Sequence, residues 1–191
     1  MSEAGTTLVV VLGGLLVLVL LWFVVSYNRF VSQTVLVKES WSQVDVELQR
    51  RHDLIPNLVE TVKGYAAHEA SVLARVTAAR AAAEQHRTDE PATRRPFEEE
   101  LGGAVHQLVA VAEAYPDLRA STSFLHLQRE LTNTEDRIAA GRRFYNGNVR
   151  ALNTRVRTFP SNLVASAFGF TTRDFFELSD PAVAVPPAAD F

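Results

Sequence analysis

The chain has 191 residues and a formal net charge of −3 at pH 7, and it contains no cysteine. This length suits one membrane anchor and one ordinary domain, because domains cluster near about 100 to 150 residues. The slight acidity excludes the strong positive field that non-specific nucleic-acid binding needs, so we expect no nucleic-acid partner. Without cysteine, disulfides, thiolate metal ligands, nucleophilic thiols and lipidated cysteines are all excluded.

An uncharged apolar segment lies near the start of the chain. It runs from Leu8 to Val25, and as a helix its 18 residues span about 27 Å, close to the hydrocarbon thickness of a bilayer. We predict one transmembrane helix here, with Trp22 and Tyr27 at the interface. A cleaved signal peptide is the alternative, but the residues before the span carry only Glu3 and lack the basic character of a signal peptide.

The basic residues lie on one side of this span. No Lys or Arg precedes it, whereas Arg29, Lys38, Arg50 and Arg51 follow it. By the positive-inside rule, we expect the N-terminus outside and the domain in the cytoplasm.

Beyond the anchor, apolar residues recur at alternating three- and four-residue steps, which is typical of helices that bury one stripe. Trp41 lies in the first stripe and is expected in the core. The four stripes run from Val37 to Leu48, from Ile55 to Ala83, from Leu101 to Tyr115 and from Phe124 to Val156. No segment shows convincing strand alternation.

The predicted fold class is all-α. It consists of an N-terminal transmembrane helix, an antiparallel four-helix bundle, and a short C-terminal helix that begins near Ser161. Residues 1–26 are assigned to the N-terminus and anchor, and residues 27–178 to the helical bundle. Residues 179–191 form a Pro- and Ala-rich tail that we expect to be disordered.

The connection between the first two helices has two interpretations. Asp53 can cap a helix in which Pro56 lies in the first turn, and this favours a turn. The stripe from Val37 to Val62 stays in phase through this point, so one long helix, kinked at Pro56, is the alternative. We favour the turn because an amphipathic stripe needs a partner close by.

Several segments resemble one bacterial family, the LemA proteins. They are YNRFV at Tyr27 to Val31, the stretch from Trp41 to Glu69, and the stretch from Ala114 to Asn146. The run DLIPNLVETVKGY, within the second stretch, is the most specific, and the resemblance continues to Phe175-Phe176-Glu177. Gly141 stands where relatives more often have alanine, a change that loosens a helix locally.

The resemblance implies a four-helix bundle behind an N-terminal span, with the N-terminus outside and the bundle in the cytoplasm. The expected location is therefore the bacterial cytoplasmic membrane. The resemblance implies no enzymatic activity, cofactor or catalytic residue.

The sequence also lacks recognisable chemistry. No histidine has the Glu-x-x-His spacing of a di-iron bundle, and His68-Glu69 lacks the second histidine of a zincin because Val72 occupies its place. Phosphate-binding, nucleophile-elbow and dinucleotide-binding motifs are absent. The histidines are interpreted as helix-surface or capping residues: His52, His68, His86, His106 and His126. We therefore predict no catalytic, cofactor-binding or metal-binding residue, and no enzyme.

Three charged stretches remain. Glu98-Glu99-Glu100 is interpreted as solvated charge at a helix start. Arg50-Arg51-His52-Asp53 is interpreted as the end of the first helix, with a partner-binding patch as the alternative. From Arg129 to Arg157 the chain carries seven arginines against three acidic residues.

The favoured function is a non-enzymatic scaffold or interaction protein at the cytoplasmic face of the membrane. Its expected partners are membrane lipid, through the anchor, and unidentified proteins, and a homo-oligomer is a further candidate. The alternatives are a module that binds or shapes anionic lipid, and an enzyme without a recognisable motif.

The lipid alternative names candidate membrane-surface residues near the end of the fourth helix. If four helices alternate in direction, the fourth returns toward the membrane. The candidates are Arg150, Arg155, Arg157, Phe175 and Phe176. The competing interpretation is that the phenylalanines close the end of the core.

Overall fold

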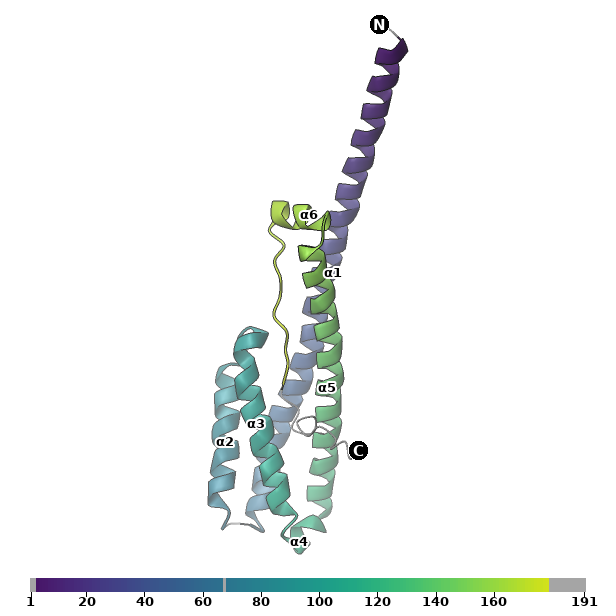
Figure 1. Cartoon of the computed structure of the whole chain (residues 1–191). Helices are drawn as coiled ribbons and strands as arrows, with labels where there is room; N and C mark the ends of the chain where they lie inside the picture. The colour runs from purple at the N-terminus through teal and green to yellow at the C-terminus, as the bar shows by residue number, and fades with distance from the viewer. Residues whose placement is uncertain (1–2, 67, 179–191) are drawn as a thin grey trace, which may run out of the picture. The chain divides into compact units, whose positions relative to one another are not determined.

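The computed structural model describes residues 3–66 and 68–178, and all regular elements within these ranges are helices. They are α1 (Glu3–Lys63), α2 (Ala70–Gln85), α3 (Pro91–Ala112), α4 (Pro116–Arg119), α5 (Thr122–Arg157) and α6 (Ser161–Phe168) (Figure 1). The all-α class and the short C-terminal helix at Ser161 are confirmed. The tail predicted at 179–191 lies outside the described residues.

The turn predicted at Asp53 is wrong, because Asp53 and Pro56 both lie inside α1. A proline inside a helix removes one hydrogen bond and costs roughly 3 kcal/mol. One continuous helix nevertheless keeps Leu48, Ile55 and Leu58 in phase, and all three are buried. Burying three such side chains is worth more than the proline costs, at about 1.5 to 3 kcal/mol each.

The chain divides into two compact units. Unit 1 contains residues 1–40 and 147–173, and unit 2 contains residues 41–146 and 174–191. Helices α1 and α5 each contribute residues to both units.

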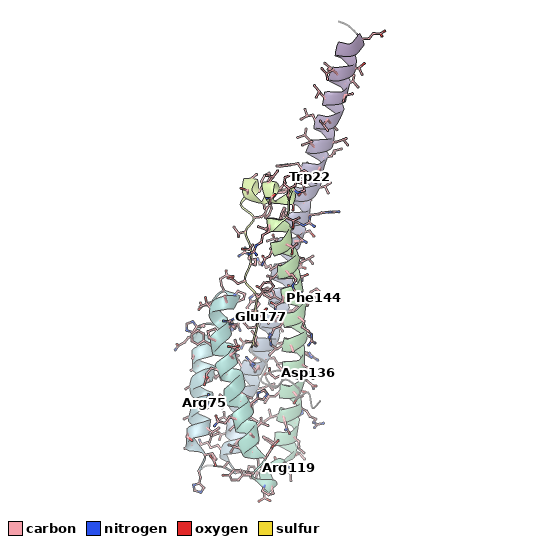
Figure 2. All side chains as sticks on the ribbon, viewed as in Figure 1. Trp22, Arg75, Arg119, Asp136, Phe144 and Glu177 are labelled. Carbon is pink, nitrogen blue, oxygen red and sulfur yellow. The ribbon has the colours of Figure 1, made fainter. Side chains whose placement is uncertain are left out.

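In unit 1, the first turns of α1 carry apolar side chains on every side. Leu8 is 59% exposed, Val10 is 73% exposed, and none of the most apolar 18-residue window is buried in protein. Figure 2 shows these side chains around the helix up to Trp22. Among the described residues, α1 is the one helix that is long and apolar enough to cross a membrane.

The other part of unit 1 is held by aromatic contacts. The Phe168 ring lies 4.7 Å from the Tyr27 ring, and the Phe170 ring stacks on Phe30 at 4.8 Å. Gly169 lies between the two phenylalanines at φ 71°, a left-handed conformation that ends α6 and that glycine adopts without strain.

Unit 2 contains one large cluster of buried apolar residues. Leu58 of α1, Val76 of α2, Leu108 of α3 and Leu131 of α5 all belong to it, and Leu118 of α4 is buried in the same cluster. Helices α2 and α3 lie side by side (Figure 1). The predicted stripes supply this core, as burial of one helix face requires. The single helix predicted from Ile55 to Ala83 is wrong, because α1 ends at Lys63 and α2 begins at Ala70.

Trp41 is half-buried in unit 2, so the expectation of full burial is wrong. Its ring lies 5.4 Å from Tyr145 and 5.0 Å from Phe176, and the Arg94 guanidinium lies 5.8 Å from its centroid. A large amphipathic ring at the edge of a core is commonly left partly exposed.

Gly141 marks a close approach of α5 to α1 within unit 2. A Cβ atom at this position would lie 3.1 Å from Cγ2 of Val44. Helix α5 continues unbroken through the glycine. Close packing, in addition to any local loosening, therefore explains why a glycine suits this position.

After α6 the chain continues without regular structure to residue 178, and two asparagines of α5 hold it. Asn146 donates from Nδ2 to the Phe176 carbonyl at 3.1 Å and accepts from the Phe176 N–H at 2.9 Å. Asn153 makes the same pair of bonds with Arg173, both at 2.8 Å. Each side-chain amide therefore satisfies both polar groups of one backbone residue.

Candidate functional site

A cluster of ionisable side chains lies inside unit 2. Arg51, His52, Arg94 and Glu98 are each at most 1% exposed. Burying a charge is costly unless the charge is paired and hydrogen-bonded. The cluster is therefore a candidate functional site of unit 2.

Glu98 is the centre of this cluster. Its Oε2 accepts a bond from Arg51 Nη2 at 2.6 Å, and its Oε1 accepts one from Arg94 Nε at 2.9 Å. The Nε2 atom of His52 lies 3.3 Å from Oε2. Both carboxylate oxygens are thus occupied by groups from α1 and α3.

The two arginines reach further acidic partners at the edge of the cluster. Arg51 Nη1 donates to Glu135 of α5 at 3.0 Å, and Arg94 Nη1 donates to Asp45 of α1. Three carboxylates therefore surround two guanidinium groups, and three helices are tied together. Such pairs specify how helices meet more reliably than they add stability.

The surroundings of Glu98 and Arg51 favour the charged form of each side chain. Burial by itself would raise the pKa of the Glu98 carboxyl, but the hydrogen bond from His52 and the charge of Arg51 outweigh it and lower the pKa to about 2. Burial would likewise lower the pKa of Arg51, but Glu135 and Glu98 outweigh it, so the pKa is raised. A general acid or base needs a pKa near the working pH. Glu98 and Arg51 are therefore suited to structural pairing and not to proton transfer.

The sequence interpretation of these residues is wrong. Glu98 does not lie at a solvated helix start, because α3 begins at Pro91 and Glu98 faces the core two turns later. Arg51 and His52 do not end a helix, because α1 continues to Lys63. His52 is accordingly no surface histidine.

The sequence pattern indicates that two of these residues are buried. Arg51 and His52 fall between Leu48 and Ile55 at the three- and four-residue steps of the buried stripe. Polar residues at buried positions of a stripe predict internal pairing. The remaining histidines fit their predicted surface role better: His68, His106 and His126 are exposed, and His86 is half-buried.

An open groove of ≈ 610 Å³ borders the cluster in unit 2. Glu99 and Glu100 of α3 and Asp136 of α5, which is labelled in Figure 2, line it together with Gly102 and Arg142. Five of the fourteen residues that line the groove are acidic. Across residues 3–66 and 68–178, no group of three His, Asp or Glu side chains is placed to hold a metal ion.

The candidate membrane-surface residues do not share one environment. Arg150 and Arg157 are exposed, and Phe175 is 37% exposed. Arg155 is half-buried, with its guanidinium 5.8 Å from the Phe30 ring centroid. The membrane role of these four residues stays a prediction.

Phe176 is different, because its side chain is 0% exposed. It packs on Trp41 within unit 2, so it has no surface to offer to lipid.

Comparison with known proteins identifies relatives. The LemA family model matches residues 40–191. The chain is 26% identical over 175 residues to "Magnetosome protein MamQ 1" and to "Magnetosome protein MamQ 2" of Paramagnetospirillum magneticum, and each match covers 79% of this chain and 64% of the relative. It is 25% identical over 146 residues to "Protein LemA" of Metamycoplasma hominis, covering 75% of this chain and 65% of that protein. The chain therefore spans less than two thirds of the length of these relatives.

Proposed function

Because this chain belongs to the LemA family, we propose that it is a membrane-anchored, non-enzymatic scaffold, which presents helical surfaces to other proteins at the cytoplasmic face of a bacterial membrane. One observation carries the proposal. A single helix, α1, contains both the exposed apolar segment at residues 8–25 and core residues of unit 2 such as Leu58. The anchor therefore continues into the domain without a linker.

For unit 2 we propose an antiparallel four-helix bundle that consists of α1, α2, α3 and α5, a different set of helices from the one that the sequence predicts. The contribution of α1, α2, α3 and α5 to one apolar core supports this arrangement. A bundle of this kind leaves the outer face of each helix free for contact with partners.

The buried cluster supports a role without catalysis. Glu98 is occupied on both oxygens and has a pKa of about 2. An enzyme would be expected to keep at least one such group available near neutral pH.

The proposed orientation of the anchor in the membrane rests on the positions of the basic residues, and it can be tested separately. Six Lys or Arg residues of unit 1 all follow the span, and none precedes it. A reporter that is active only outside the membrane should stay silent when fused after Phe191, and one that is active only inside should respond. The opposite pattern would contradict the proposed topology.

Two of the relatives described above carry the word magnetosome in their names, and the third does not. We therefore extend only the family-level role to this chain.

Site-specific photo-crosslinking in living cells tests the scaffold role. A photoreactive residue would replace Val46, Asp136 or Phe144, one at a time, in the full chain; Val46 and Phe144 are 65% and 54% exposed, and Asp136 lines the groove. A scaffold is expected to yield discrete protein adducts that differ between positions. The same unresolved smear of adducts from all three positions would contradict the scaffold role. If the purified chain turned over a substrate, and one polar substitution abolished that activity, an enzyme would be favoured.

A further inference from the structure

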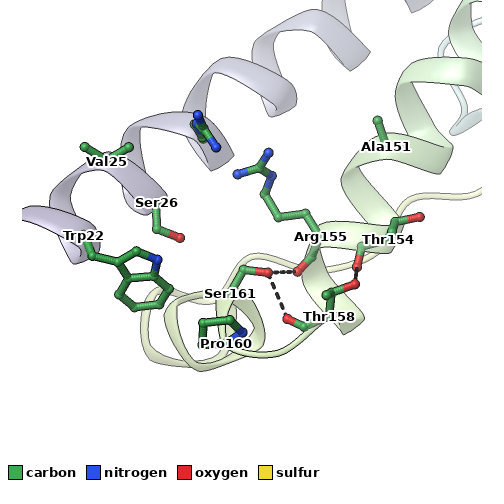
Figure 3. Close-up of a pocket in the computed structure, with 10 residues that line it drawn as sticks. Trp22, Val25, Ser26, Ala151, Thr154, Arg155, Thr158, Pro160 and Ser161 are labelled. Carbon is green, nitrogen blue, oxygen red and sulfur yellow. Dashed lines mark hydrogen bonds between the residues drawn. The ribbon is translucent and has the colours of Figure 1, made fainter. Parts of the chain in front are cut away.

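A hollow of ≈ 400 Å³ lies within unit 1, beside the end of the predicted membrane span. Its wall includes Trp22, Val25, Ser26 and Arg29 of α1, Arg155 of α5 and Ser161 of α6. Figure 3 shows the Arg155 side chain extending across this space toward α1. Its size is within the range of small-molecule sites, about 300 to 1,000 Å³.

Two arginines line the hollow without an acidic partner. Among the ion pairs of the described residues, none involves Arg29 or Arg155. The Nε atom of Arg155 is buried and has no hydrogen-bond partner. Burial, and then the charge of Arg29, lower the pKa of Arg155, which shows that the two cations repel each other. A bound anion would relieve both costs.

The charge of unit 1 points the same way. Its residues include six Lys or Arg but only Glu3 and Glu39, a net charge of +4 in a chain whose total is −3. Glu3 precedes the apolar segment, and Glu39 does not line the hollow. The unit therefore attracts anions at the end of the span where the hollow lies.

The surroundings of the hollow suit the boundary between headgroups and acyl chains. Val25 is the last residue of the apolar segment, and tryptophans such as Trp22 favour this level of the bilayer. Unit 1 also exposes apolar side chains near the start and the end of α6: Phe159 is 74% exposed, Leu163 57% and Phe168 50%. Phe168 contacts Tyr27, two residues beyond the apolar segment.

We propose that this hollow binds the phosphate of an anionic phospholipid between Arg29 and Arg155. Ser26, which is 5% exposed and lines the hollow, offers a hydroxyl donor to the same phosphate. Two guanidinium groups disfavour the amine of a zwitterionic headgroup, so the lipid is one with a net negative charge. The proposal rests on the membrane anchor of the proposed function and does not depend on the scaffold role.

Native mass spectrometry of the full chain in detergent tests the site. Phosphatidylglycerol is added in one arm and phosphatidylcholine in the other. The double variant Arg29→Gln/Arg155→Gln should lose bound phosphatidylglycerol by at least about tenfold, since a hydrogen bond to a charged group is worth about one decade or more. The matched control, Arg129→Gln/Arg143→Gln, removes the same charge from exposed positions of α5 outside the hollow and should retain the lipid. Equal loss in both doubles, or equal retention of phosphatidylcholine by the wild type, would overturn the proposal.

Thermal unfolding gives a second readout that does not depend on how well the double variant folds. Phosphatidylglycerol should raise the Tm of the wild type, because a ligand that binds the folded state stabilises it. Arg29 is exposed, so Arg29→Gln alone should keep the fold and lose most of this rise, whereas Arg143→Gln, at another exposed position outside the hollow, should keep the rise. An undiminished rise in Arg29→Gln would contradict the site.

Two further measurements separate the possible failures. Inorganic phosphate at the lipid concentration should not raise the Tm, and an equal rise would show that the hollow takes free phosphate instead of lipid. All variants should stay in the membrane fraction of cells. Recovery of the wild type in the soluble fraction would instead contradict the anchor on which both proposals rest.

Discussion

Units 1 and 2 differ in net charge and in whether their most apolar residues are exposed or buried. Unit 1 has a net charge of +4 and exposes its most apolar segment, whereas unit 2 has 13 Lys or Arg against 20 Asp or Glu and buries its apolar stripes. An exposed apolar helix followed by basic residues suits a bilayer with an anionic surface. An acidic surface around an apolar core suits water and keeps a protein soluble.

The two units also surround arginines differently: Arg51 and Arg94 are buried in unit 2, and Arg155 is half-buried in unit 1. Unit 2 surrounds Arg51 and Arg94 with carboxylates, and Glu98 contacts both of them. Unit 1 leaves Arg155 beside Arg29, with Phe30 as an aromatic neighbour. In unit 2, carboxylates of the protein neutralise the arginines and specify how the helices pack. In unit 1, the arginines lack acidic partners, and under our proposal a lipid phosphate neutralises them.

The largest effect is expected at the centre of the buried cluster. Glu98→Ala should lower the free energy of unfolding by about 3 to 5 kcal/mol, because it leaves Arg51 and Arg94 buried without their shared partner. Urea unfolding of the full chain in detergent, followed by circular dichroism, measures this. Glu100→Ala is the matched control, since Glu100 pairs with Arg75 at the exposed surface and should cost at most about 1 kcal/mol. Equal losses would contradict the balance proposed for unit 2.

A smaller loss is expected when a buried phenylalanine of unit 2 is removed. Phe176→Ala should cost about 3 kcal/mol in the same assay, the lower end for emptying a phenylalanine site, because the residue lies in a segment without regular structure. Phe168→Ala, which removes a half-exposed ring from unit 1, should cost clearly less. A larger loss of stability in Phe168→Ala than in Phe176→Ala would show that aromatic packing in unit 1 contributes more to stability than Phe176 does.

The pH dependence of stability tests the charged state of Glu98. Its folded pKa of about 2 lies below its ordinary value of 4.5, so its contribution is complete above pH 4.5 and is lost as the pH falls from 4.5 toward 2. At pH 3 the loss should be roughly 2 kcal/mol, at 1.36 kcal/mol per unit. Glu98→Gln should show a shallower loss over this interval. An unchanged slope would mean that other carboxylates cause the acid sensitivity.

The smallest effects concern two glycines of α5, one in each unit. Gly147→Ala in unit 1 should stabilise the chain by about 0.5 to 1 kcal/mol, since no atom lies within 4 Å of the added Cβ. Gly141→Ala in unit 2 should gain less or lose stability, because Val44 lies at 3.1 Å. The Tm difference between these variants measures the cost of close packing. Equal increases in Tm for Gly141→Ala and Gly147→Ala would show that Val44 shifts away from the added methyl group at no cost in stability.

Local patterns predicted the elements that depend on local physics. The uncharged run at residues 8–25, the helical stripes and the short helix at Ser161 were all visible in the sequence. The continuity of α1 through Pro56 was not predicted correctly. The cost of a proline is local and can be estimated from sequence, whereas the benefit of burying Ile55 and Leu58 depends on distant partners.

The buried cluster shows the same division. Arg51 and Glu98 are 47 residues apart in the chain, so their pairing depends on how α1 and α3 meet. The in-phase position of Arg51 signals burial, but the sequence does not name its partner. Glu98 stands in a run of three glutamates, and only the rotation of α3 decides which of them faces inward.

Asn146 and Asn153 each bind one backbone residue of the irregular segment that follows α6, through the N–H and the carbonyl of that residue. Recognition of this kind is indifferent to side-chain identity, so substitution at position 173 should be tolerated over evolutionary time. The asparagines have little such freedom, because Asp lacks the donor and Leu lacks both groups. In a lineage of this chain, position 173, whose side chain is exposed, should therefore vary more than Asn146 and Asn153.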